Sequence, residues 1–160
     1  MEISDIAQSD LEEVWRLNQD SVPHVSSVEL AEMQWFANHA HYFRVARLAD
    51  ELAGFLIGLR PGLPYGSPNY RWFSDNYRDF GYIDRIAVAA TARRSGVATR
   101  LYQDFAASLD ADVGVMTCEV NIRPANESSM RYHENFGFVQ VGTQQTDGGK
   151  KEVALLEMKL

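Results

Sequence analysis

The chain has 160 residues, a formal net charge of −7 at neutral pH and a single cysteine, Cys118. Its length suits one domain over residues 1–160, and its 46% apolar and 23% charged residues are ordinary for a globular protein. The acidic balance argues against nucleic acid as a partner, because such partners require a basic surface. One cysteine rules out an internal disulfide and fits a reducing compartment such as the cytoplasm.

No segment approaches the eighteen apolar residues of a membrane span, and the acidic start Met1–Asp5 does not resemble a signal peptide. We therefore expect no membrane partner. Residues 2–7 form a candidate first strand. Two helices should follow, opened by the capping-box patterns at residues 9–12 and 26–29 and separated by Pro23.

Residues 42–48 and 52–59 have the composition of two strands joined as a hairpin. Residues 60–79 contain three prolines and two glycines, which predict an irregular loop. Aromatic side chains are frequent in this loop, so it should be ordered. They could line a substrate pocket or pack against a partner subunit, which makes a homodimer conceivable: Tyr65, Tyr70, Trp72 and Phe73.

The most informative stretch is a predicted strand at residues 83–88, a polar crossing with Arg93 and Arg94, and an amphipathic helix beginning near Val97. A helix N-terminus presents unpaired N–H groups and the positive end of the helix dipole. With two arginines and Gly96 beside it, this junction favours an anion such as a diphosphate. A helix start with merely solvated arginines is the alternative.

Residues 113–120 predict a further strand, and residues 121–125 a turn. A short helix should then run from Asn126 to Gly137, where glycine suits a left-handed cap. A closing hairpin of residues 138–146 and 151–158 completes the chain. Alternating strands and helices followed by a hairpin imply a mixed sheet with helices on both faces.

Two motifs together resemble a known family. Arg93-x-x-Gly96-x-Ala98 is similar to the pyrophosphate-binding motif of the GNAT N-acetyltransferase superfamily. Asn126-x-x-Ser129-x-x-x-His133-x-x-x-Gly137-Phe138 resembles the family's second conserved block, in which a tyrosine usually occupies the position of His133. The resemblance implies an α/β (α+β) fold, with a central mixed, mostly antiparallel sheet of about six to seven strands flanked by about four helices.

The resemblance also implies acetyl-CoA as acyl donor and no metal. The main chain of Ile86, Ala87 and Val88 would pair with the pantetheine arm, and an N–H near Val88 would bind the thioester oxygen. Asn126 and Ser129 would hold the arm from the other side. The diphosphate would lie on the loop and the first turn of the helix, formed by Arg93, Arg94, Ser95, Gly96, Val97, Ala98 and Thr99.

The implied reaction moves the acetyl group to the primary amine of a small or amino-acid-like molecule. An ammonium group must lose a proton before it attacks, so a base is needed; Asp84 and Glu119 are the candidates. Asp84 can instead be the ion-pair partner of Arg85. His133 is the expected general acid at the sulfur, with Tyr132 as its replacement. A CoA-binding sensor without turnover and a protein N-terminal or lysine acetyltransferase are the competing interpretations.

Overall fold

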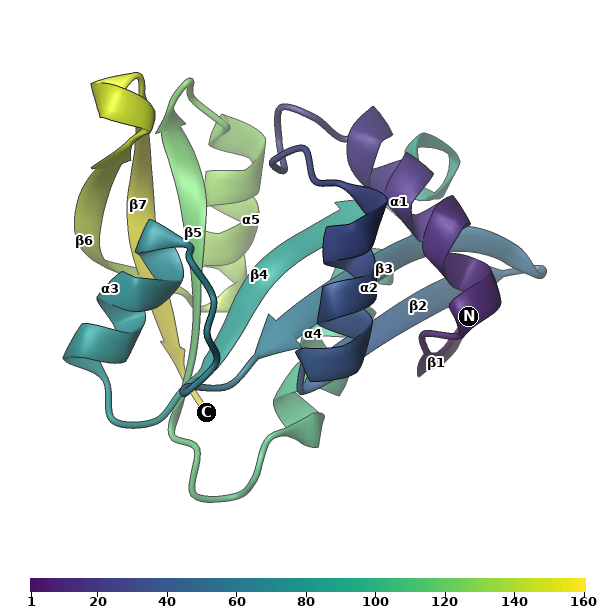
Figure 1. Cartoon of the computed structure of the whole chain (residues 1–160), viewed down its shortest axis with the longest axis horizontal. Helices are drawn as coiled ribbons and strands as arrows, with labels where there is room; N and C mark the ends of the chain where they lie inside the picture. Colours follow the sequence, from purple (N-terminus) through teal and green to yellow (C-terminus); the bar gives the residue numbers. More distant parts are fainter. The chain divides into compact units, whose positions relative to one another are not determined.

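The computed structural model describes residues 1–160, which form two compact units (Figure 1). The first unit comprises Met1–Leu59 and Asp84–Ser108, and the second comprises Arg60–Ile83 and Leu109–Leu160. Seven strands are ordered β1-β2-β3-β4-β5-β7-β6, and β4 (Gly81–Val88) contributes residues to both units. A single domain over the whole chain stays a prediction.

In the first unit, β1 (Glu2–Asp5), β2 (Tyr42–Leu48) and β3 (Glu51–Leu59) pair antiparallel. Figure 1 shows α1 (Leu11–Asp20) and α2 (Leu30–His39) in front of these strands and α4 (Val97–Ser108) behind them. The apolar stripes of the helices close the core from the two faces. Their fully buried side chains include Val14, Met33, Phe36, Leu101 and Phe105.

Two glycines of β3 let α4 approach the sheet closely. A Cβ at Gly54 would lie 2.8 Å from the Ala87 carbonyl oxygen and 2.9 Å from Cγ1 of Val97, the first residue of α4. A Cβ at Gly58 would lie 2.3 Å from the Phe105 ring. These contacts are too short for real atoms, so the position of α4 depends on both glycines.

In the second unit, β5 (Val115–Arg123) and β6 (Val139–Thr146) each pair antiparallel with β7 (Lys151–Lys159). The start of β4 runs parallel to β5, with Gly81 opposite Met116. Figure 1 shows α3 (Pro68–Asn76) in front of these strands and α5 (Glu127–Phe136) behind them. The sheet is therefore mixed and mostly antiparallel as expected, with five α-helices rather than about four.

Both predicted capping boxes at the start of the chain are wrong. Helix α1 begins after Asp10, whose carboxylate accepts a hydrogen bond from the Ala7 N–H at 3.0 Å. Helix α2 begins after Glu29, where Glu29 and Glu32 form the reciprocal box. Each helix starts later than the serine pattern indicated: Ser9 lies within a 3-10 turn, Gln8–Asp10, that precedes α1, and the Ser26 hydroxyl accepts a hydrogen bond from Arg85 instead of capping a helix.

The predicted irregular loop of residues 60–79 contains helix α3. Ser67 caps it by accepting a hydrogen bond from the Tyr70 N–H at 3.3 Å, and Pro68 occupies its first turn. Proline is favoured at this position because its missing N–H is not needed there. Ser67 and Pro68 therefore mark the start of a helix. This helix was not predicted from the sequence, because proline was treated only as a residue that interrupts regular structure.

The end of β5 also differs from expectation. The strand continues to Arg123 instead of turning at Asn121, with a register shift against β7 between these two residues. The following helix begins and ends as predicted: Asn126 is its N-cap, and Gly137 closes it in the left-handed region with φ of 118°. None of the helices combines the length and apolar character needed to cross a membrane.

Candidate functional site

The loop of residues 89–96, called the arginine loop below, connects β4 to α4 within the first unit. Arg93, Arg94, Ser95 and Gly96 are all exposed. Arg94 and Gly96 lie in the left-handed region, with φ of 64° and 79°. A Cβ built at Gly96 would meet no protein atom within 4 Å, so the space beside this backbone is open. A left-handed arginine is uncommon and costs free energy, which points to a functional constraint.

This junction has the features of an anion site. The first turn of α4 contains no acidic residue, and its Val97 side chain is buried while Ala98 and Thr99 are half-buried. The dipole of α4 and the two arginine side chains all favour negative charge at the arginine loop. The open space at Gly96 and these donors fit a diphosphate, and a side chain at Gly96 would reduce that space.

Asp84 is followed in β4 by Arg85, whose guanidinium is buried. Oδ2 of Asp84 accepts a hydrogen bond from Nε of Arg85 at 2.7 Å, and the two side chains are only 3% and 4% exposed. This geometry matches the ion-pair alternative for Asp84 and weighs against its use as a base. A buried carboxylate that balances a buried guanidinium cannot give up its charge without leaving that cation uncompensated.

Arg85 also ties β4 to the segment between α1 and α2. Its Nη1 donates to Oδ1 of Asn18 at 3.1 Å and to the Ser26 carbonyl oxygen at 3.3 Å. Its guanidinium lies 5.2 Å from the centre of the Phe36 ring. The Asp84–Arg85 pair therefore holds the α1–α2 connection in place within the first unit.

Glu119 is the second carboxylate candidate, and it lies in β5 of the second unit. The hydroxyl of Tyr82 contacts both of its carboxylate oxygens, at 2.9 and 2.8 Å. Tyr82 is fully buried, whereas Glu119 is half-buried. The tyrosine therefore orients a carboxylate that retains partial exposure, so Glu119 is a more accessible candidate base than Asp84.

Helix α5 places Asn126, Ser129 and His133 at successive helical steps in the second unit. Oδ1 of Asn126 accepts hydrogen bonds from the Ser129 N–H at 3.3 Å and the Ser128 hydroxyl at 3.2 Å, so Asn126 is the N-cap of α5. Nδ1 of His133 lies 2.7 Å from the Ser129 carbonyl oxygen and 3.3 Å from its hydroxyl. These bonds fix the orientation of the imidazole.

The surroundings of His133 favour its neutral form. The ring is buried, with 5% of the residue exposed, and packs edge-on against Phe138. Burial lowers the pKa of His133, while the hydrogen bond to Ser129 opposes that shift. Because a carbonyl only accepts, we assign the proton of neutral His133 to Nδ1, which leaves a lone pair on Nε2. Tyr132, half-buried, packs edge-on against His133 and lies tilted beside Phe136.

The four predicted aromatic residues do not share one environment. Phe73 is fully buried and Tyr70 is 3% exposed, both in a cluster with Phe80 and Tyr82. Half-buried Trp72 packs over Gly142 of β6. Phe73 is thus a core residue, so its expected place in a pocket wall is not supported.

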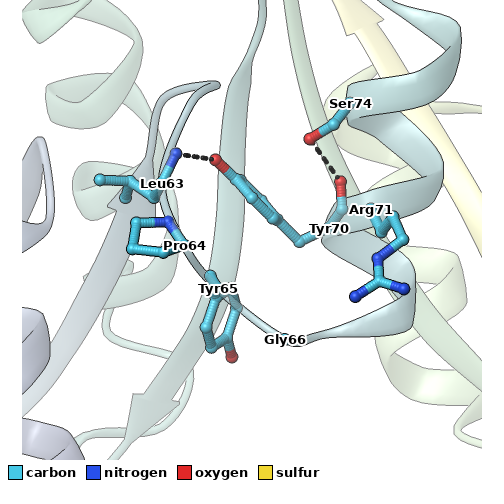
Figure 2. Close-up of a pocket in the computed structure, with 7 residues that line it drawn as sticks. All are labelled: Leu63, Pro64, Tyr65, Gly66, Tyr70, Arg71 and Ser74. Atoms are coloured by element: carbon cyan, nitrogen blue, oxygen red, sulfur yellow. Dashed lines mark hydrogen bonds between the residues drawn. The ribbon is translucent and has the colours of Figure 1, made fainter.

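Tyr65 and Tyr70 do line a pocket in the second unit, of about 440 Å³. Figure 2 shows it between the loop of residues 63–66 and the face of α3 that carries Arg71 and Ser74. The sequence did not single out Arg71 and Ser74, because their helix was not predicted. The pairing of Tyr82 with Glu119 also required knowledge that β4 and β5 are adjacent.

The side chains support neither a cysteine nucleophile nor a metal site. Burial raises the pKa of the Cys118 thiol well above its ordinary value, and the nearby charge of Glu119 raises it further. Such a thiol is not a nucleophile at neutral pH. No group of three or more histidine, cysteine, aspartate or glutamate side chains is placed to hold a metal ion.

Comparisons with known proteins agree with the motifs. The model of the acetyltransferase (GNAT) family matches residues 7–138. An N-alpha-acetyltransferase of Sulfolobus acidocaldarius is 24% identical over 134 residues, which cover 83% of this chain and 76% of that protein.

Solved structures have the same fold. Ard1 from Thermoplasma volcanium has a TM-score of 0.79 at 19% identity, covering 99% of this chain and 97% of that one. The ribosomal-protein-S18-alanine N-acetyltransferase of Escherichia coli has a TM-score of 0.73 at 15% identity, covering 99% and 92%. With the family model spanning most of its length, the chain belongs to the acetyltransferase (GNAT) family and is an acyltransferase.

Proposed function

We propose that this acyltransferase moves an acetyl group from acetyl-CoA to the primary amine of a small, amino-acid-like acceptor by direct attack with both substrates bound. Members of the GNAT family use acetyl-CoA. The observation that carries the proposal for this chain is the arginine loop, with its exposed arginines and the open space at Gly96. Bound acetyl-CoA supplies an acetyl group activated as a thioester.

The donor end is held by the first unit. The amides from Arg94 to Thr99 bind the diphosphate, and Arg93 and Arg94 add charge. The main chain of residues 86–88 pairs with the pantetheine arm. Asn126 and Ser129 of α5 keep the cofactor-binding role that the family resemblance gives them, in addition to their capping contacts.

Glu119 is the general base in this proposal. Its carboxylate accepts the proton that the acceptor ammonium must lose, and the Tyr82 hydroxyl keeps it oriented. Asp84 is assigned to the ion pair with Arg85 instead. We expect Glu119→Gln to lower turnover strongly without unfolding the protein, because glutamine can still accept a hydrogen bond from Tyr82.

His133 has a smaller part. The neutral imidazole donates its Nδ1 proton to Ser129, so only the minor protonated form can donate from Nε2. A thiolate leaves readily because its ordinary pKa is about 8.5. His133 therefore assists departure of the thiol weakly, and Tyr132 remains the alternative donor.

The pocket beside Tyr65 and Tyr70 supports a small acceptor, since its volume of about 440 Å³ lies within the range of small-molecule sites. A protein N-terminus is the second candidate acceptor. Two names favour it: the Sulfolobus relative is an N-alpha-acetyltransferase, and the Escherichia coli structure is a ribosomal-protein-S18-alanine N-acetyltransferase.

A thiol-release assay with acetyl-CoA tests the proposal against two panels, one of small amines and amino acids and one of short peptides with free N-termini. Turnover of small amines alone supports it, whereas turnover of peptides alone selects the second candidate. Tight CoA binding with no turnover in either panel would indicate a sensor and contradict both.

A further inference from the structure

The pocket in the second unit has an apolar wall that is held rigidly. The rings of Tyr65 and Tyr70 meet edge-to-face with centres 5.5 Å apart. The Tyr70 hydroxyl donates to the Arg60 carbonyl oxygen at 2.7 Å. It also accepts from the Leu63 N–H at 3.1 Å, the contact drawn in Figure 2. Because the hydroxyl is bonded on both sides, the ring offers a fixed apolar surface to a ligand.

The opposite side of the pocket has one charged group, the Arg71 guanidinium. Figure 2 shows Arg71 and Tyr65 extending from different sides of the pocket. Arg71 is exposed and makes no side-chain hydrogen bond or ion pair with the rest of the chain. Arg60 of the same unit, in contrast, is paired with Asp79 and Asp110. The donors of Arg71 are therefore available to a ligand, in a chain whose net charge is −7.

The pocket wall also contacts the residue that orients the candidate base. The Tyr70 ring lies 5.5 Å from the Tyr82 ring, measured between centres, and the Tyr82 hydroxyl contacts the Glu119 carboxylate. All four residues of this chain of contacts, Tyr65, Tyr70, Tyr82 and Glu119, belong to the second unit. The buried Tyr82 ring therefore lies between the Tyr70 side of the pocket and the Glu119 carboxylate.

We propose that this pocket binds the carboxylate-bearing end of the acceptor, so that the enzyme selects amino acids with an apolar or aromatic side chain over cationic amines. Arg71 pairs with the carboxylate, and Tyr65 and Tyr70 contact the apolar part. A planar guanidinium binds a carboxylate through two parallel, charge-assisted hydrogen bonds. An acceptor with a carboxamide in place of the carboxylate, or with only a cationic amine, cannot form this pair. This inference rests on the proposed small-molecule acetyltransfer and names its substrate class.

Three probes that share the phenethylamine skeleton test the charge requirement: phenylalanine, its carboxamide and phenethylamine. We expect wild-type kcat/KM for phenylalanine to exceed that of the other two by about 10- to 100-fold, the worth of a charge-assisted hydrogen bond. Arg71→Met keeps most of the apolar stem and removes the guanidinium, so kcat/KM for phenylalanine should fall towards that for phenethylamine. Arg78→Met is the matched control, because Arg78 is exposed in the same unit and does not line the pocket.

A second variant tests the space rather than the charge. A Cβ at Gly66 would meet no atom within 4 Å, so Gly66→Leu should fold and partly fill the pocket. Gly114→Leu is its control, at an equally open position outside the pocket. We expect Gly66→Leu to lower kcat/KM for phenylalanine at least about 10-fold, the cost of losing one good contact, and Gly114→Leu to leave it unchanged.

Equal wild-type rates for the three probes, or an equal loss for all of them in Arg71→Met, would overturn the inference. If no amine is acetylated although acetyl-CoA binds, the proposed function fails, and calorimetry then judges the pocket separately. Phenylalanine should bind wild type and lose about 10-fold or more in affinity with Arg71→Met. No binding to wild type at millimolar concentration would overturn the inference there too.

Discussion

The N-termini of α4 and α5 each follow a strand, but they differ in capping and in the charge of the neighbouring side chains. At α5, Asn126 caps the helix with its own side chain, and acidic Glu127 occupies the first turn. At α4, the first turn has no acidic residue, and Arg93, Arg94 and an open glycine precede it. One terminus is satisfied from within the chain, while the other has the open space and positive charge on which the proposed anion site rests.

The comparison shows why a strand–loop–helix pattern alone does not locate a ligand. Both helices have a dipole of the same sense, so the dipole cannot distinguish them. The distinguishing features are open space and uncompensated positive charge at the loop. If this is correct, changes at Gly96 should affect binding, whereas changes at Asn126 should mainly affect stability.

The largest effect is expected for Gly96→Val. Its side chain would occupy the space assigned to the diphosphate and remove at least two charge-assisted contacts, so CoA affinity should fall at least about 100-fold. The positive φ adds a stability cost of about 1–2 kcal/mol. Calorimetric titration with CoA measures the first effect, and urea unfolding measures the second.

Gly62→Val is the matched control, because Gly62 has φ of 95°, no atom within 4 Å of a built Cβ, and a place in the second unit. It should show the same strain and normal CoA affinity. A similar loss of affinity in both variants would mean that strain, and not a blocked site, explains the result.

The next largest effect is expected for the double variant Arg93→Gln, Arg94→Gln. Removing two exposed charges should weaken CoA binding about 30-fold at low salt, at roughly 1 kcal/mol for each exposed charge. The difference from wild type should shrink as salt is added, because screening weakens the wild-type interaction. A salt-independent difference in titrations at low and high ionic strength would argue against an electrostatic role.

Asn126→Ala should act mainly on stability. Loss of the N-cap should lower the free energy of unfolding by about 1 kcal/mol, as should Ser67→Ala at the N-cap of α3. Denaturant unfolding measures both. A loss of CoA affinity in Asn126→Ala as large as that in Gly96→Val would remove the distinction between the two helix termini.

The smallest effects are expected at His133. His133→Asn should reduce kcat by about 10-fold or less, the low end for an acid catalyst, and leave CoA affinity intact. Steady-state kinetics with the best amine, together with CoA titration, check this. A loss of CoA affinity equal to that of Gly96→Val would contradict the assigned role.

His133 should also make stability depend on pH. Because burial lowers its pKa, the unfolded chain binds this proton at a higher pH than the folded chain does. Neutral His133 therefore makes its full contribution to the free energy of unfolding above about pH 6.5. This contribution declines as the pH falls towards the pKa of His133 in the folded chain. Wild type should therefore lose more unfolding free energy between pH 7 and pH 5 than His133→Asn; equal losses would exclude this linkage.

The sequence allowed prediction of the features that local rules determine. The start of α4, the cap at Asn126, the left-handed Gly137 and the closing hairpin follow from periodicity and cap chemistry. The Asp84–Arg85 alternative was also foreseeable, because the two residues are neighbours in the chain.

What could not be predicted depends on contacts between distant segments. Tyr82 meets Glu119 only because β4 lies beside β5, and Phe73 is a core residue only because α3 packs on the sheet. The role of Arg71 was hidden for the same reason, since helix α3 itself was missed. The proposed acceptor-side residues come from such segments, whereas the proposed donor site is a compact local motif.

Calorimetric titration of the wild-type protein with coenzyme A tests the central claim most directly. The account predicts saturable heat with one site per chain, and loss of that heat in Gly96→Val but not in Gly62→Val. Absence of any heat with coenzyme A at millimolar concentration would contradict the assignment of the arginine loop, and with it the proposed reaction.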